Sequence, residues 1–215
     1  MNELRCTLLS DGSSDASLLP ILNWLLVENG VTLPIQSEWA DLSRHVGSSK
    51  PSLSDKIRVG LKFYPCDLLF VHRDAETENR AKRVAEIESA LSAADAETQP
   101  VVCVVPVRMM EAWLLFDEVA IKQAAENSRY RGDLDLPDLN RLEDLANPKE
   151  TLHVLLKQAS GLNNRRLRRF PVQARIRRVA EYLTDFSPLR QLNAFRSLET
   201  DIQSLVSIKR WDRGE

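Results

Sequence analysis

Residues Leu4 to Asp15 read LRCTLLSDGSSD, so an apolar run typical of a buried strand passes directly into an acidic turn. Gly12 suits a tight turn, and we expect Asp15 to be the N-cap of a helix through the apolar stretch Ala16 to Val27. A strand that leads at once into a helix is the basic unit of an α/β sheet.

The same arrangement occurs twice more in the first half of the chain. Asp67 to Val71 leads into HRDAE (residues 72–76), and Val101 to Val107 leads into RMME (residues 108–111). Short, continuously apolar strands are typical of parallel sheets that are buried on both faces. We therefore predict an α/β fold with a mainly parallel sheet flanked by helices.

Three further segments fit this plan. Leu33 to Trp39 predicts a second strand, and its proline favours the edge of the sheet. Glu78 to Ala93 has the spacing of an amphipathic helix, and Met109 to Phe116 is expected to begin another helix. A serine at position 52 or 54 is expected to cap a helix between the second and third strands.

The second half of the chain has a different character. From Ala120 onward there is no comparable valine-rich run, and residues 129–147 are polar and predict a long loop. Pro148 suits the first turn of a helix, and residues 173–183 and 189–206 are further helical candidates. We predict an α/β core over residues 1–118, with a helical and loop-rich extension over residues 119–215 packed on it.

The composition is that of an ordinary soluble protein. Of 215 residues, 43% are hydrophobic and 28% charged, and the net charge of −2 argues against a chain that is basic throughout. No run is long enough to span a membrane. Cys6, Cys66 and Cys103 lie in or beside apolar runs, which indicates reduced core thiols and predicts a cytoplasmic protein.

Acidic residues follow the predicted strands and indicate a metal site. In an α/β sheet, ligands bind outside the carboxyl ends of the strands, so we expect Asp11, Asp74 and Glu76 to converge there. Such a cluster repels itself unless a cation neutralises it, and carboxylate oxygens suit Mg²⁺ or Mn²⁺. Asp74 and Glu76 are two residues apart, and on an extended chain they would point the same way.

Each of these residues also has a simpler interpretation. Asp11 can belong to a plain turn, Glu76 can solvate a loop, and His72 is more typical of a hydrogen-bonded core residue than of a catalyst. Glu111 is the only acid in a long apolar stretch, and we weigh metal ligation equally with an ion pair to Arg108.

A dense cluster of arginines lies in the second half of the chain. The four that we expect to contact a nucleic-acid backbone are Arg165, Arg166, Arg168 and Arg169. Arginines at this density bind phosphates and make binding sensitive to salt. Their alternation with Leu167 and Phe170 suits an amphipathic docking helix nearly as well.

Taken together, Asp11-Gly12 and Asp74-Ala75-Glu76 resemble the acidic motifs of the TOPRIM domain, which binds metal in topoisomerases, primases and OLD-family nucleases. Asp11 stands where that family usually has Glu, and Glu76 stands where it usually has Asp. The chain is also similar to a family of uncharacterised prokaryotic TOPRIM-like proteins through Pro106, EAWL (residues 111–114) and NPKE (residues 147–150).

This resemblance implies a Mg²⁺- or Mn²⁺-dependent nuclease of a prokaryotic defence or mobile-element system, with Asp11, Asp74 and Glu76 holding one or two metals. It implies that Glu111 is a further ligand or supporting acid. The alternative from a different class is a non-catalytic binding module or sensor that docks a partner ATPase. A third interpretation is phosphoryl transfer on nucleotides, although the chain lacks a glycine-rich phosphate loop of its own.

Overall fold

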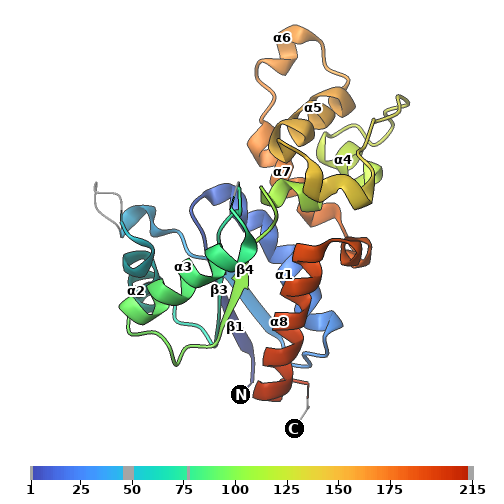
Figure 1. The fold of residues 1–215 in the computed structure, drawn as a ribbon. Coiled ribbons are helices and arrows are strands. Elements are labelled where there is room, and N and C mark those ends of the chain that lie inside the picture. Colours follow the sequence, from blue (N-terminus) through green and yellow to red (C-terminus); the bar gives the residue numbers. More distant parts are fainter. Residues whose placement is uncertain (1, 46–50, 77, 213–215) are drawn as a thin grey trace.

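The structure is a computed structural model that describes residues 2–45, 51–76 and 78–212 (Figure 1). Its strands are β1 (Leu4–Leu9), β2 (Ile35–Trp39), β3 (Leu68–His72) and β4 (Val101–Val104). Within the described residues these four strands form one parallel sheet in the order β2-β1-β3-β4. The predicted α/β fold is confirmed, and β2 lies at the edge, as its proline suggested.

Helices cover both faces of this sheet. Leu8 and Phe70 belong to one apolar cluster and Leu9 and Val71 to another, because successive side chains of a strand point to opposite faces. The helices on the first face are α1 (Leu19–Glu28) and α8 (Asn193–Lys209), and those on the second are α2 (Leu53–Phe63) and α3 (Arg80–Ala93). Burial on both faces explains why the central strand β3 is almost entirely apolar, whereas the edge strand β2 carries Gln36, Ser37 and Glu38.

The strand order creates a switch point between β1 and β3. The chain leaves β1 through α1 on one face of the sheet, and it leaves β3 towards α3 on the other face (Figure 1). The two loops therefore diverge at the carboxyl ends of adjacent strands. A crevice at such a divergence is where open α/β sheets bind ligands.

A helical lobe lies beyond the carboxyl ends of the strands (Figure 1). Its helices are α4 (Glu118–Ala124), α5 (Pro148–Ser160), α6 (Asn164–Leu167) and α7 (Val172–Tyr182). No described residue after position 118 is in a strand, and Pro148 occupies the first turn of α5, both as predicted. The lobe is followed by α8, so the sheet face that α1 and α8 cover is packed by two separate stretches of the chain.

Several connections are 3₁₀ helices where the sequence predicted α-helix or loop. They are η1 (Ser13–Leu18), η2 (Leu42–Arg44), η3 (Met110–Leu114), η4 (Leu139–Asp144) and η5 (Ser187–Gln191). The expectation of a continuous helix from Met109 is wrong, because η3 ends before α4 begins. The predicted serine cap is confirmed, since Ser52 Oγ accepts a hydrogen bond from the Asp55 backbone N–H at the start of α2. None of the described helices combines the length and the apolar character that crossing a membrane requires.

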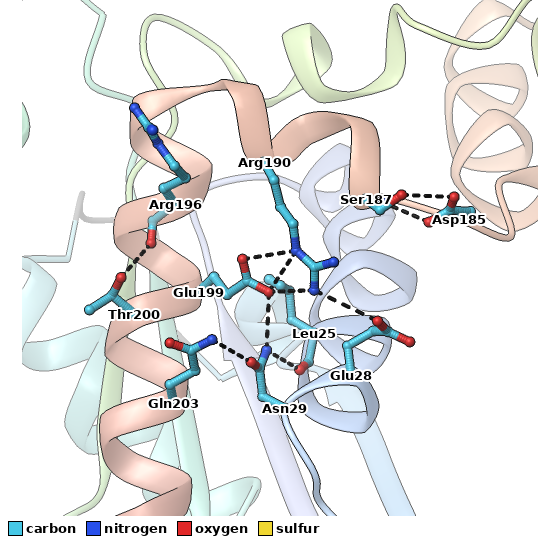
Figure 2. A network of polar contacts seen from close by, with 10 residues as sticks. All are labelled: Leu25, Glu28, Asn29, Asp185, Ser187, Arg190, Arg196, Glu199, Thr200 and Gln203. Carbon is cyan, nitrogen blue, oxygen red and sulfur yellow. Dashed lines mark hydrogen bonds and ion pairs between the residues drawn. The ribbon is translucent and has the colours of Figure 1, made fainter.

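A half-buried ion pair between Arg190 of η5 and Glu199 of α8 also contacts the end of α1 through Asn29 (Figure 2). Glu199 on α8 is almost fully buried, and Arg190 donates to both of its carboxylate oxygens at 2.7–3.1 Å. Asn29, just after α1, donates to Glu199 Oε1 and to the Leu25 carbonyl oxygen, and it accepts from Gln203. The Arg190 guanidinium also lies 5.1 Å from the centre of the Trp24 ring.

Replacing Glu199 with Gln should destabilise the protein, because it removes the negative charge that Arg190 and Asn29 surround. Loss of one partner costs about 3–5 kcal/mol in a buried pair and about 0–1 in an exposed one. Arg190 is 39% exposed, so we expect a loss of about 2 kcal/mol in urea denaturation. Glu28→Gln is the matched control, since Glu28 lies 3.7 Å from the same guanidinium but is itself 44% exposed. Equal effects of the two changes would contradict this account.

Candidate functional site

A polar pocket of about 290 Å³ lies at the switch point between β1 and β3. Its acidic lining residues are Asp11, Asp15, Asp74 and Glu76, and its basic ones are Arg73 and Arg83. We call this the acid pocket. Three of the acids proposed from the sequence therefore line one cavity, together with Asp15, which was expected to be only a helix cap.

Asp74 is the most perturbed acid of the pocket. Burial raises its pKa to about 6, the charge of His72 opposes this rise, and the charges of Glu111 and Asp15 add to it. The Met110 backbone N–H donates to Asp74 Oδ1 at 3.0 Å and fixes the side chain. Asp74 is thus a desolvated carboxyl with two further acids close by.

Asp15 is in the middle of η1 and not at a helix N-cap. Gly12 is the N-cap residue, and its backbone N–H donates to Asp15 Oδ2 at 3.0 Å. The Ser14 hydroxyl donates to the other carboxylate oxygen at 3.3 Å. Asp15 lines the acid pocket together with Asp74, and its charge contributes to the raised pKa of Asp74.

Glu111 is almost fully buried in η3, with 3% of its surface exposed. The predicted pairing with Arg108 is wrong, because Arg108 has a positive φ of 60° and precedes η3 instead of sharing a helix face with Glu111. Its ion-pair partner is Lys149, whose Nζ lies 3.7 Å from Glu111 Oε1. Lys149 begins α5, so two sequence segments that carried the family resemblance meet here.

Asp11 and Glu76 are already paired with basic side chains. Asp11 Oδ1 accepts from Lys56 at 2.6 Å, and Arg73 lies 3.5 Å from its other oxygen. Burial works against ionisation of Asp11, but the hydrogen bond and charge of Lys56, with the charge of Arg73, hold its pKa below the ordinary value. Glu76 lies 3.5 Å from Arg83.

The chain is not extended at Glu76, which corrects the expectation that Asp74 and Glu76 point the same way. Glu76 has a positive φ of 54°, and its backbone N–H donates to the Arg108 carbonyl oxygen at 3.1 Å. Both side chains line the acid pocket nevertheless. Glu76 is largely exposed at its rim, whereas Asp74 is largely buried.

His72, the last residue of β3, is buried against Asp74. Its Nδ1–H donates to the Val104 carbonyl oxygen at 2.9 Å, which leaves Nε2 3.5 Å from Asp74 Oδ1. His72 is therefore the hydrogen-bonded core residue expected from the sequence, but only one of its two ring nitrogens is used in that way. The second nitrogen faces Asp74, and His72 lines the acid pocket.

The donor chemistry of the acid pocket fits a hard divalent cation, but its arrangement does not yet enclose one. No three of the described His, Cys, Asp and Glu side chains are grouped in a metal-binding geometry. Burial first, and then the negative charges of Glu111 and Asp15, raise the pKa of Asp74, and a bound cation would relieve both effects. A cation would have to draw Asp15, Asp74 and Glu111 together.

The arginine cluster lies far from this pocket, at the tip of the helical lobe (Figure 1). Arg165, Arg166, Arg168 and Arg169 are exposed, and no described acid forms an ion pair with any of them. The alternative of an amphipathic docking helix meets only the single turn of α6 here, since α7 starts at Val172. The exposed arginines are free to contact an anionic surface.

No protein-family model, curated protein or solved structure matches this chain. The resemblance to the TOPRIM domain therefore remains a hypothesis. The site has to be interpreted from its own geometry.

Sequence reasoning missed two residues of the site. Asp15 carries a signal in the sequence, since it is a second acid in the same short turn as Asp11. Lys149 carries none that is local, because its approach to Glu111 depends on how α5 packs against η3.

The raised pKa of Asp74 predicts how stability depends on pH. An unfolded aspartate ionises near 3.8, so between pH 3.8 and about 6 the folded protein keeps a proton that the unfolded chain has lost. The free energy of unfolding falls across this pH interval. Above it the total loss is at most about 3 kcal/mol, because the pKa of Asp74 differs by roughly two between the folded and unfolded states. Asp74→Asn should remove this loss.

We therefore expect Asp74→Asn to be more stable than the wild type at pH 7.5 and to match it near pH 3.5. Chemical denaturation of both proteins at the two pH values measures the difference. Asp11→Asn is the matched control and should behave oppositely at pH 7.5, because the pKa of Asp11 is lowered by Lys56. A stability gain for Asp74→Asn that does not change with pH would contradict the assignment.

Proposed function

We propose that this protein is a divalent-cation-dependent enzyme that cleaves phosphodiester bonds in nucleic acid. The observation that carries the proposal is the desolvated Asp74, which lines one pocket with Asp11, Asp15 and Glu76 at the switch point of a parallel sheet. Desolvated carboxylates are retained where a cation or a proton transfer needs them. A TOPRIM-like ancestry and a prokaryotic defence role belong to the proposal and rest on the sequence resemblance.

In this proposal Asp15, Asp74 and Glu111 hold one or two cations, with Asp11 and Glu76 joining when their ion pairs open. Mg²⁺ or Mn²⁺, when bound, supplies positive charge that stabilises the phosphate oxygens and activates water. The protein itself supplies the buried carboxylates and keeps them fixed through backbone hydrogen bonds to Asp74 and Asp15.

Basic and titratable side chains suit the remaining requirements of the reaction. Arg73 and Arg83 bring positive charge to the acid pocket, and Lys56 reaches its wall. His72 Nε2, which lies 3.5 Å from Asp74 Oδ1, can accept the proton of an attacking water while Asp74 holds the cation. The ammonium group of Lys149, from α5 of the lobe, adds a positive charge beside Glu111.

A second function, that of a non-catalytic module which docks a partner ATPase, has its own supporting observation. Asp11 and Glu76 are neutralised by Lys56, Arg73 and Arg83 without any metal. A site of this kind can keep its fold while having lost its cations. Reduced thiols at three unpaired cysteines agree with a cytoplasmic location for either function.

Asp74→Asn and Asp15→Asn should each abolish cleavage that depends on Mg²⁺ or Mn²⁺. Loss of a residue that only supports a metal ligand lowers activity by about 10–100-fold, so loss of a ligand should cost about 100-fold or more. Cleavage of labelled single-stranded and duplex DNA and RNA measures the loss, and calorimetric titration with Mn²⁺ measures cation binding. Glu78→Gln is the control, because Glu78 pairs with Lys82 outside the pocket.

A wild type that neither cleaves nucleic acid nor binds Mn²⁺ would favour the docking module. Full cleavage by folded Asp74→Asn would move the activity to another site or to a contaminant.

Replacing the four exposed arginines of the cluster with Gln should weaken binding to nucleic acid of any sequence. If they contact phosphates, the slope of log affinity against log salt should flatten by about one unit per lost contact. Fluorescence anisotropy at several salt concentrations measures this slope. Arg177→Gln with Arg178→Gln is the control, since both side chains pair with Glu181 on α7. An unchanged slope, with loss of a protein partner in a pull-down, would support docking instead.

A further inference from the structure

A second, larger pocket adjoins the acid pocket. It has a volume of about 550 Å³ and shares Asp11 and Gly12 with its neighbour. Its other polar and aromatic lining residues are Ser10, Ser13, Trp39, Asp41, Ser43 and Lys56. We call it the Trp39 pocket. Cavities of this size accommodate a small molecule or a single nucleotide unit.

Trp39 is held in a fixed orientation at one wall of this pocket. It ends the edge strand β2, and its indole Nε1–H donates to Ser10 Oγ at 2.9 Å. The Ser10 hydroxyl in turn donates to the Gly12 carbonyl oxygen at 3.1 Å, which ties the indole to the turn that carries Asp11. Part of the ring packs on the core, and the remainder lines the pocket.

Lys56 stands where the two pockets meet. It projects from α2, lines the Trp39 pocket and donates to Asp11 Oδ1 at 2.6 Å, and Asp11 lines both cavities. An anionic group that lies across this boundary would meet the ammonium group of Lys56. A phosphate is such a group, and its nucleoside would then extend into the Trp39 pocket.

The remaining lining suits a nucleoside. Ser13 and Ser43 provide hydroxyl groups that both donate and accept hydrogen bonds, as sugar hydroxyls and base edges require. An indole provides an aromatic surface on which any base can stack. An apolar ligand would leave these hydroxyls without partners.

We propose that the Trp39 pocket binds one unpaired nucleotide of the substrate, with its phosphate at Lys56 and the acid pocket. This inference rests on the proposed cleavage of nucleic acid and specifies its substrate as single-stranded. A base can enter such a pocket only when it is not paired and stacked in a duplex. Affinity therefore comes from one stacked base beside the scissile phosphate, in addition to contacts along the backbone.

The test compares binding of a labelled single-stranded oligonucleotide with binding of its duplex, in the presence of EDTA so that no cleavage occurs. Trp39→Ala should weaken single-strand binding at least about tenfold, as loss of one stacking platform does, and leave duplex binding unchanged. Trp39→Phe keeps an aromatic ring and should restore most of the affinity. Tyr182→Ala is the matched control, because Tyr182 is an exposed aromatic residue on α7.

A second variant does not depend on the core contacts of Trp39. Ser43 is exposed at the pocket wall, so Ser43→Trp should fill the cavity and weaken single-strand binding without disturbing the fold. Unchanged single-strand affinity in both Trp39→Ala and Ser43→Trp overturns the inference, even if the wild type cleaves nucleic acid. Loss of affinity in both variants supports it, even if no cleavage is found and the proposed activity fails. A wild type that binds no nucleic acid overturns both.

Discussion

A parallel sheet has to be covered on both faces, and the rest of this structure follows from that constraint. Strand β3 is buried along its whole length and β1 is buried except at Arg5, so neither face of the sheet centre can be left to water. Helices α2 and α3 cover one face, and they come from the same half of the chain as the strands. The other face is covered by α1 and by α8, which returns after the whole lobe has been formed.

This arrangement also places the candidate site. Because α1 and α3 lie on opposite faces, the loops after β1 and β3 separate and leave the acid pocket between them. The charges around the pocket are balanced unevenly. Asp11 and Glu76 at the outside have basic partners, whereas Asp74 inside is surrounded by acids and has only His72 beside it. The carboxyl group of Asp74 is therefore the place in the pocket where an added positive charge would stabilise most.

The sequence predicted the fold well because its signals are local. An apolar run, a capping serine at position 52 and Pro148 at the start of a helix each depend on residues a few positions apart. The predicted set of acids also reached the correct edge of the sheet. Its details were less predictable, because the direction of a side chain depends on the local backbone, as the 3₁₀ turn at Asp15 and the positive φ of Glu76 demonstrate. The pair of Glu111 and Lys149 could not be predicted from local sequence signals, because the two residues are 38 positions apart in the chain.

The return of α8 to the sheet has a consequence for how the protein is made. During synthesis β1, β3 and β4 leave the ribosome well before α8, and one face of the sheet lacks part of its cover until that helix arrives. Domains fold as units once their contacts are available, so this core cannot be completed early in translation. The lobe is synthesised after β4 and before α8, so its helices can form before the sheet is fully covered. The contacts of Glu199 with Asn29 and of Arg190 with Glu28 then join α8 to α1, which makes the sheet face beneath α8 the surface most in need of protection in a nascent chain.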